Sequence, residues 1–389
     1  MSDGAKSYNA SDITVLHGWE AIRKRPGMYL GTTSERGLHN AVFEVAGRAV
    51  NEVLAGRATS VDVTLTPDGG VSVADDGPDV PVEAAGDTDG PGLEALLTRA
   101  PDQWELVGRT TAAVGMVILG LCVTNALSSR LTAEVRREGT RWVQRYTRGV
   151  PVAPPTALEP AADGGTTITF WPDPDIFETV ECSFAVLAER FRELAFLNQG
   201  LGISLTDARH PGEPRSVRFQ SPGGARDFVA FLDASVGTPV HPDVIGFAWE
   251  DQRMEGTAEV ALRWCASREE RIRGFANSRP TPYDGTHVEG FRDGVAAAVN
   301  AYAREHRLLT AAGPDLSADR IGEGLTAVVS VKLDFPEFVG APRGTLGSAP
   351  VRGCVAEAVR EHLGTWLEAH PEQAAAIIAR IAPAPSGRG

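Results

Sequence analysis

The first 220 residues alternate helix-like stretches with short β-rich runs, and this alternation limits the fold more than any other feature of the sequence. The β-rich runs are residues 60–66 (SVDVTLT), 129–137 (SRLTAEVRR) and 166–171 (TTITFW). Such alternation is typical of a layered α/β sandwich. Apolar residues at helical spacing in residues 184–198 predict a helix that closes this first unit.

A second α/β series begins after residue 220. It contains β-rich runs at 259–265 and 324–335, a long helix-like stretch at 293–306, and a C-terminal helix that we expect to end near Ile381. A chain of 389 residues has room for two units, each with its own core. The expected division is an N-terminal arm (1–15), a first unit (16–220), a second unit (221–382) and a flexible tail (383–389).

Composition narrows the protein class. Apolar residues make up 42% and charged residues 23% of the chain, which is typical of a soluble globular protein. The sequence has no apolar run of about 20 residues and no signal-peptide pattern at its start, so we expect a cytoplasmic protein without a membrane segment. The net charge of −14 predicts weak DNA binding by the chain alone. Four cysteines without metal-site spacing predict buried free thiols.

Residues 42–56 (VFEVAGRAVNEVLAG) form a predicted helix with Glu44 and Arg48 one turn apart. Glu44, Arg48 and Asn51 fall on one face, while Val42, Val45, Ala49 and Val53 face a core. Considered alone, this helix favours an ordinary surface ion pair between Glu44 and Arg48, worth about 0.3–0.5 kcal/mol.

Further motifs flank this helix on both sides. They are RKRPGMYLG (23–31), VADDGPDVP (73–81), GGTTITFWP (164–172) and GTHVEGFR (285–292). In this order and spacing they resemble the ATPase region of the gyrase B family of bacterial type II topoisomerases, which belongs to the GHKL ATPases. The resemblance covers residues 7 to 380. It implies a GHKL (Bergerat) α/β sandwich followed by a ribosomal-protein-S5-like α/β transducer domain.

The resemblance implies a defect in metal binding and hydrolysis. Glu44 matches the glutamate that acts as general base on the attacking water. Arg48 stands where the family has a magnesium-binding asparagine, and a guanidinium has only donors and a positive charge. Asn51 stands where the family has aspartate. We therefore expect no metal ligands and impaired hydrolysis, with Arg48 contacting phosphate if nucleotide binds.

The adenine end of the implied pocket is better preserved. Asp75 matches the family aspartate that accepts a hydrogen bond from the adenine amino group, and Thr166 matches the threonine that supports it. Gly77 and Pro81 also match. The resemblance thus implies ATP, or another adenine-like or purine-like ligand, as the cofactor.

The phosphate end departs from the family pattern. Of the glycine-rich lid, only Gly115 and Gly120 remain, and the β-branched Val117 and Ile118 do not take positive φ cheaply. Residues 112–127 therefore predict a buried helix or strand in place of a mobile lid. Arg343 stands for the lysine that reaches the γ-phosphate in the family.

The resemblance also suggests partners. Residues 7–13 (SYNASDI) are similar to the arm that crosses to the other protomer, with Tyr8 and Ile13 at the anchoring positions. We expect a homodimer or a mixed dimer with a gyrase B protein. The sequence shows no TOPRIM segment after the transducer, so we expect no DNA cleavage by this chain alone.

Three functions stay open at this point. The first is a gyrase B-like pseudo-ATPase that acts as a binding or regulatory paralogue. The second is a residual ATPase clamp with Glu44 as base and Arg48 and Arg343 on phosphate. The third is a pocket repurposed for another small molecule, with Glu44 and Asp75 as acid/base or orienting groups.

Overall fold

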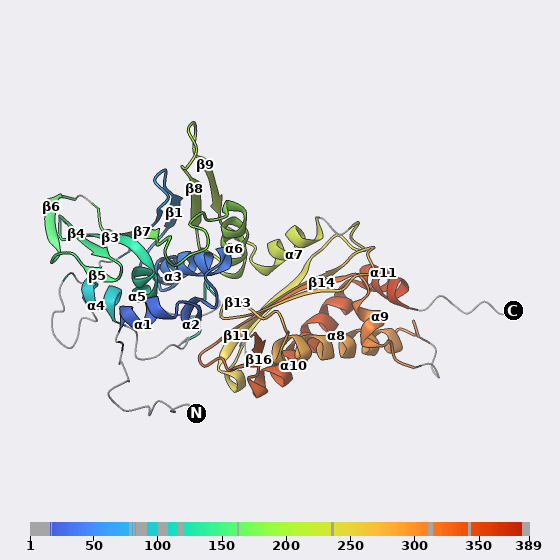
Figure 1. Cartoon of the computed structure of the whole chain (residues 1–389). Coiled ribbons are helices and arrows are strands. Elements are labelled where there is room, and N and C mark those ends of the chain that lie inside the picture. The colour runs from blue at the N-terminus through green and yellow to red at the C-terminus, as the bar shows by residue number, and fades with distance from the viewer. Residues whose placement is uncertain are drawn as a thin grey trace, which may run out of the picture.

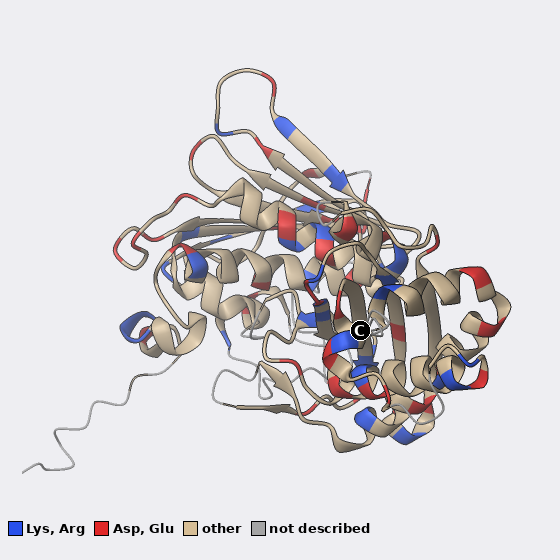
Figure 2. Cartoon of the chain, turned by 90° about the vertical axis from the view of Figure 1, so that its right-hand side faces the viewer, with Lys and Arg blue, Asp and Glu red and all other residues tan. Residues whose placement is uncertain are grey.

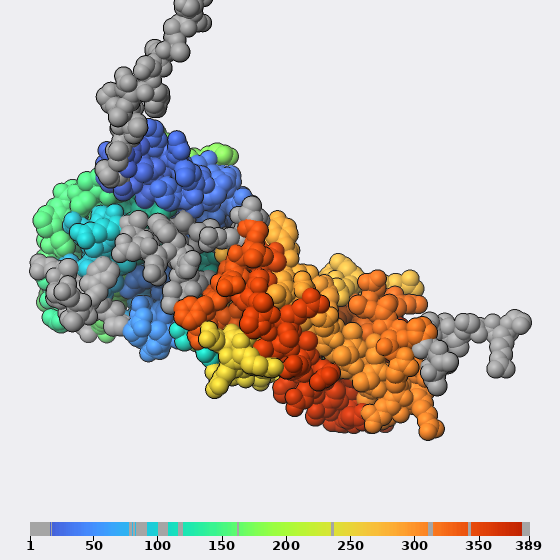
Figure 3. All heavy atoms as spheres, turned by 90° about the horizontal axis from the view of Figure 1, so that it is seen from below, coloured from blue at the N-terminus to red at the C-terminus, as the bar shows by residue number. Residues whose placement is uncertain are grey.

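The computed structural model describes residues 16–382 apart from several short gaps. The gaps are residue 17, 78–79, 81, 83–91, 100–107, 116–119, 162, 235–236, 310–313 and 341–343. Two α/β units lie side by side and give the molecule an elongated outline (Figures 1 and 3). This confirms the predicted α/β fold class.

Within its described residues, the first unit is built on a sheet of nine strands in the order β5-β4-β3-β7-β2-β1-β8-β9, with β6 paired to β4. All neighbours are antiparallel except β1 and β8. The strands are β1 (Val61–Leu65), β2 (Val71–Asp75), β3 (Ser128–Arg137), β4 (Thr140–Thr147), β5 (Val150–Pro151), β6 (Thr156–Pro160), β7 (Gly165–Pro172), β8 (Ile203–Asp207) and β9 (Arg215–Phe219). The helices are α1 (Trp19–Lys24), α2 (Gly27–Leu30), α3 (Glu35–Leu54), α4 (Leu93–Thr98), α5 (Leu121–Ala126) and α6 (Phe184–Leu197).

The second unit has a sheet in the order β10-β11-β14-β12-β13, in which only β12 and β14 are parallel among the described strands. Its strands are β10 (Ile245–Asp251), β11 (Gly256–Trp264), β12 (Arg271–Ala276), β13 (Arg279–Pro280) and β14 (Leu325–Leu333), and β15 (Phe338–Val339) pairs separately with β16 (Thr345–Leu346). Its helices are α7 (Ala225–Asp233), η2 (Gln252–Met254), α8 (Thr286–Glu305), α9 (Ala318–Gly322), α10 (Ala349–Ala369) and α11 (Pro371–Ile381). Figure 1 shows α8, α9 and α10 on one side of this sheet and α7 on the other.

Several sequence predictions coincide with observed elements. Helix α3 buries Val42, Val45 and Ala49 in the first core, as its apolar spacing predicted. The predicted closing helix is α6, and the predicted C-terminal helix ends at Ile381. All four cysteines are buried and free, which confirms the prediction from their spacing.

The prediction for residues 112–127 is wrong in part. Residues 121–126 form α5, and residues 116–119 lie outside the described part of the chain, but residues 112–115 are buried without regular secondary structure. The reason is that their backbone groups bond to side chains and to the second unit, as described below.

The surface carries charges of both signs. In the cartoon of Figure 2, basic and acidic segments are interspersed along the chain, and the sequence has 51 acidic against 37 basic residues. Among the described helices, none is both long enough and apolar enough to cross a bilayer.

Candidate functional site

Helix α3 presents the candidate site residues. It begins after Ser34, whose extended backbone precedes an acidic first turn, and it runs for 20 residues. Its buried face packs on β1 and β2. Residues four apart share a face of the helix, so Glu44 and Arg48 lie on one face of α3, and Arg48 reaches Asp75 at the end of β2.

Arg48 does not form a surface ion pair. One terminal nitrogen donates to Asp75 Oδ2 at 2.5 Å, and the other donates to Thr166 Oγ1 at 3.2 Å. Asp75 and Thr166 are directly opposite each other in the β2–β7 pairing, so strand register brings both within reach of one guanidinium. The Arg48 side chain is 15% exposed, and its two partner residues are buried. We call these three residues the Arg48 site.

Both oxygens of the Asp75 carboxylate are already hydrogen bonded. Oδ1 accepts from the backbone N–H of Gly77 at 3.1 Å, and Oδ2 accepts from Arg48. Two glycines allow the close packing: a Cβ at Gly165, where φ is +135°, would lie 2.4 Å from the Asp75 carbonyl oxygen, and one at Gly77 would lie 3.0 Å from Oδ1. Burial raises the pKa of the Asp75 carboxyl, while the Arg48 charge and hydrogen bonds oppose that shift.

Glu44 lies one turn before Arg48 and has a different partner. Its Oε2 accepts a hydrogen bond from the backbone N–H of Gly120 at 3.1 Å. Gly120 precedes α5 with φ of +77°, a conformation that favours glycine. Gly120 therefore orients the Glu44 carboxylate through its backbone.

Residues 108–115, which we call the strut, connect α3 to the second unit. The Asn51 amide exchanges two hydrogen bonds with the backbone of Ala112, at 2.8 and 3.3 Å. The backbone N–H of Ala113 donates to the Asn277 carbonyl at 2.9 Å. Arg109 forms ion pairs with Asp334 at 2.7 Å and with an exposed glutamate, Glu250, at 2.6 Å.

Arg190 on α6 secures the same strut from another direction. Its buried guanidinium donates to the carbonyls of Val114, Ala113 and Ser278, each at 2.8 Å, and pairs with Glu193 at 3.0 Å. A charged side chain used this way satisfies carbonyls that would otherwise be buried without partners. The strut therefore has fixed contacts to α3, α6 and the second unit.

Known proteins are similar to this chain over nearly all of its length. A family model described as DNA gyrase B matches residues 224–388. The DNA gyrase B protein of Streptomyces coelicolor is 44% identical over 392 residues, which cover 97% of this chain and 57% of that protein. The 43K ATPase domain of Thermus thermophilus gyrase B, solved with an aminocoumarin, has a TM-score of 0.77 and 32% identity, and the match covers 93% of each chain. The chain belongs to the DNA gyrase B family.

Another gyrase B protein and a topoisomerase IV domain are also similar to nearly the whole chain. The DNA gyrase B protein of Mycolicibacterium smegmatis is 39% identical over 407 residues, covering 97% of this chain and 60% of that protein. The topoisomerase IV ATP-binding domain of Francisella tularensis, solved with an inhibitor, has a TM-score of 0.74 and 27% identity, and the match covers 94% of this chain and 96% of that one. The chain thus spans 57–60% of the length of these curated gyrase B relatives.

The gyrase B resemblance can now be placed residue by residue. The structure brings Asp75, Gly77 and Thr166 together around Arg48 of α3, and Glu44, one turn earlier, is bonded to Gly120. Gly115 is buried in the strut. Arg48, suggested from the sequence for a phosphate contact, instead lies against the two side chains suggested for adenine. Pro81, Arg343, Tyr8 and Ile13 lie outside the described residues.

Sequence reasoning missed the residues that hold the strut. Arg190 is 76 residues from Val114, Asn277 is 169 residues from Gly108, and Asp334 is 225 residues from Arg109. No local motif marks these residues. The one available signal was the presence of charged residues inside otherwise apolar helical and strand patterns, as at Arg190.

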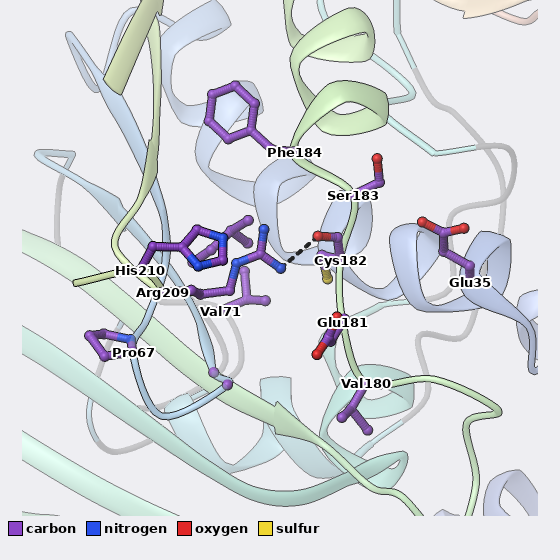
Figure 4. A pocket seen from close by; sticks show the side chains of 13 residues that line it. Glu35, Pro67, Val71, Val180, Glu181, Cys182, Ser183, Phe184, Arg209 and His210 are labelled. Carbon is purple, nitrogen blue, oxygen red and sulfur yellow. Dashed lines mark hydrogen bonds between the residues drawn. The ribbon is translucent and has the colours of Figure 1, made fainter. Parts of the chain in front are cut away.

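A pocket of the first unit lies apart from the Arg48 site. It has a volume of about 510 Å³ and lies between the β1–β2 turn, residues 180–184 and residues 209–210 (Figure 4). Its central cation, Arg209, is already paired with Asp207 at 2.7 Å and donates to the Cys182 carbonyl. Its carboxylates, Glu35 and Glu181, are exposed. These contacts leave it weaker than the Arg48 site as a functional candidate.

Proposed function

We propose that this chain is a gyrase B-like, hydrolysis-impaired pseudo-ATPase that acts by binding, as a regulatory relative of type II topoisomerases. One observation carries the proposal: Arg48 hydrogen bonds to both Asp75 and Thr166. In the resembled family, these two positions recognise adenine. Here a side chain of the protein itself takes up the acceptors that a purine amino group would use.

A purine enters this pocket only if Arg48 moves. Separating one partner from a buried ion pair costs about 3–5 kcal/mol. That cost corresponds to a loss of roughly two to three and a half orders of magnitude in affinity. A purine amino group that replaced Arg48 on Asp75 would recover part of it, so this range is an upper bound. The proposed consequence is weak binding of ATP and of adenosine alike.

Magnesium does not fit the residues present. The side chain at the magnesium position is the Arg48 guanidinium, which repels a cation and has no acceptor atom. Among the described residues, no group of three or more His, Cys, Asp or Glu side chains could hold a metal ion. We therefore assign no metal-dependent step to this site.

The test compares the wild type with Arg48→Asn. Calorimetry with ATP and adenosine, with and without Mg²⁺, should show weak wild-type binding that Mg²⁺ leaves unchanged. Arg48→Asn should bind ATP at least tenfold more tightly and in a Mg²⁺-dependent way. Arg36→Asn, an exposed position on the same helix, is the matched control and should behave like the wild type.

Two outcomes would contradict this proposal. Wild-type ATP hydrolysis that requires Mg²⁺ and is as fast as that of an active gyrase B would support the residual clamp, with Glu44 as base. Tight wild-type binding of a ligand unrelated to purines at the Arg48 site would support a repurposed pocket.

The proposed partner is a cellular gyrase B or a second copy of this chain. Related protomers can share a two-fold interface, because such an interface is self-complementary. We expect co-purification with gyrase B and reduced supercoiling as this protein is titrated in. Tyr8→Ala with Ile13→Ala should abolish both effects, whereas Arg36→Asn should not. No association and no change in supercoiling at micromolar excess would refute the regulatory role.

A further inference from the structure

A pocket of about 470 Å³ lies between the two units, away from the Arg48 site. Its floor belongs to the second sheet, on the side that carries α7 and is opposite to α8 and α10 (Figure 1). Its wall is the end of α6, where Leu197 and Gln199 line the space. The volume is in the range of pockets that take small organic ligands.

The floor carries an ordered set of polar side chains. Thr257 is directly opposite Lys332, and Glu259 is directly opposite Ser330, in the β11–β14 pairing. Residues two apart on a strand share a face, so all four side chains are on the same side of the sheet. We call these four residues the polar platform.

The platform ends where the sheet becomes apolar. The next pair on the same face, Ala261 and Val328, is buried in a cluster with Phe228 of α7. Helix α7 therefore covers the apolar part of this face, and the polar part is left to line the pocket. The uncovered part of this sheet face is polar, which suits a ligand with polar groups.

The two charged side chains of the polar platform, Lys332 and Glu259, are each hydrogen bonded within the protein and can form further hydrogen bonds. Lys332 Nζ donates to Asn198 Oδ1 at 3.0 Å, one of the three bonds an ammonium can donate. Glu259 Oε1 accepts from the backbone N–H of Ala225 at 2.9 Å, and a carboxylate has further acceptor capacity on its second oxygen. Burial lowers the pKa of Lys332 and raises the pKa of Glu259, as expected for two charges with incomplete solvation.

Lys332 is unusual in this chain. Only three of the 37 Lys and Arg residues are lysine, and the other two are Lys6 and Lys24. An ammonium is a compact point charge with rotatable donors, whereas a guanidinium is a planar fork. The lysine therefore matches a narrow site in which one donor is fixed on Asn198 and the others can turn toward a ligand.

We infer that this pocket binds a small organic acid that has an apolar side chain and a hydroxyl or amino group. Its carboxylate pairs with Lys332, and its hydroxyl or amino group bonds to Glu259 and Ser330. Its apolar part lies against Leu197 and Ala248, which also line the pocket. Such a ligand touches both units, so it stabilises their relative placement.

The test uses phenyllactate and L-phenylalanine as probes for calorimetry and thermal unfolding of the full chain. We expect saturable binding of at least one of them below millimolar concentration. 2-Phenylethanol, which lacks the carboxylate, and lactate, which lacks the ring, should bind at least tenfold more weakly. Inorganic phosphate controls for simple anion binding and should not compete.

Substitutions in the polar platform test whether the probes bind there. Lys332→Met should weaken probe binding at least tenfold, and Ser330→Ala should weaken it several-fold, while Lys24→Met in α1 should leave it unchanged. A cooperative thermal transition of Lys332→Met without probe, close to that of the wild type, checks that this variant is folded. The inference does not rest on the proposed function, and Arg48→Asn should not alter probe binding. No saturable binding at millimolar probe, or equal binding by wild type and Lys332→Met, would overturn it.

Discussion

The Arg48 site and the polar platform place a cation and a carboxylate near each other in opposite ways. In the first unit, Arg48 and Asp75 bond directly at 2.5 Å, and Thr166 and Gly77 take up further hydrogen-bonding positions. In the second unit, Lys332 and Glu259 bond to Asn198 and Ala225 instead, on the floor of a pocket. A directly paired set of charges fills its own site, whereas charges held apart by other partners leave room for a ligand.

This difference explains why the Arg48 site, whose residues match the gyrase B pattern, is less open to a ligand than the polar platform, which matches no motif. Asp75, Gly77 and Thr166 keep the residue types that the gyrase B resemblance assigns to adenine recognition. A single change four residues after Glu44 supplies a donor that reaches both Asp75 and Thr166. The platform, in contrast, has no motif, and only the strand pairing shows that its four residues share a face.

The largest expected effect is a loss of stability when the direct pair is broken. Asp75→Asn should lower the free energy of unfolding by about 3 kcal/mol, because it leaves the Arg48 charge largely buried without a counterion. Glu259→Gln should cost less than about 1 kcal/mol, because the amide oxygen can still accept from Ala225 and Lys332 keeps Asn198. Urea unfolding of both variants checks the contrast, and equal losses would show that the two charge arrangements do not differ as described.

A smaller effect is expected at the strut. Asn277 is fully buried, and its side-chain amide donates to the Leu333 carbonyl at 2.9 Å and accepts from the Leu333 N–H at 2.8 Å. Asn277→Ala should cost about 1–3 kcal/mol, because it leaves backbone groups unsatisfied. Hydrogen exchange in residues 108–115 should accelerate. Arg109→Ala, at a more exposed position, should accelerate exchange there with little change in global stability, and unchanged exchange in both variants would contradict the role of the strut.

The smallest effect concerns pH and arises at two buried histidines of the second unit. Burial lowers the pKa of His241 and of His287, both in the second unit, to about 4. The unfolded chain binds protons below about pH 6.5, while these folded-state imidazoles stay neutral. Stability is therefore full above that pH and falls as the pH drops toward 4.

At about pH 5.5, each of the two histidines should reduce stability by about 1 kcal/mol relative to about pH 7.5. Replacing His287 with Asn should flatten this part of the pH profile, while replacing the exposed His362 with Asn should not. Urea titrations at the two pH values make the measurement. A profile as steep in His287→Asn as in the wild type would show that this buried histidine does not titrate as described.

The sequence predicted much of the fold because the fold depends on local periodicity. Strands β1, β3, β7, β11 and β14 and helices α3, α6 and α11 all follow runs whose apolar spacing is visible in the chain. Helical period alone placed Glu44 and Arg48 on one face. The error at residues 112–115 arose because their apolar composition suggested regular structure, whereas their backbone groups bond to Asn51, Arg190 and Asn277.

The contact that closes the Arg48 site could not be predicted in the same way. Arg48 is 27 residues from Asp75 and 118 from Thr166, and its choice of partner depends on the register between β2 and β7. From the sequence, a phosphate contact for Arg48 was equally compatible with its position on the helix. Which distant polar group Arg48 contacts depends on how the strands pack against α3, and the sequence of α3 alone does not show this.

The strut also joins the part of α3 near Arg48 to the second unit by a continuous series of hydrogen bonds. Asn51, which holds Ala112, is less than one helical turn from Arg48, and Asn277 holds the same segment from the second unit. Any displacement of the second unit against α3 has to break these hydrogen bonds or move α3 with it. The segment therefore couples the position of the second unit to the helix that holds the guanidinium, through hydrogen bonds of its backbone to Asn51 and Asn277.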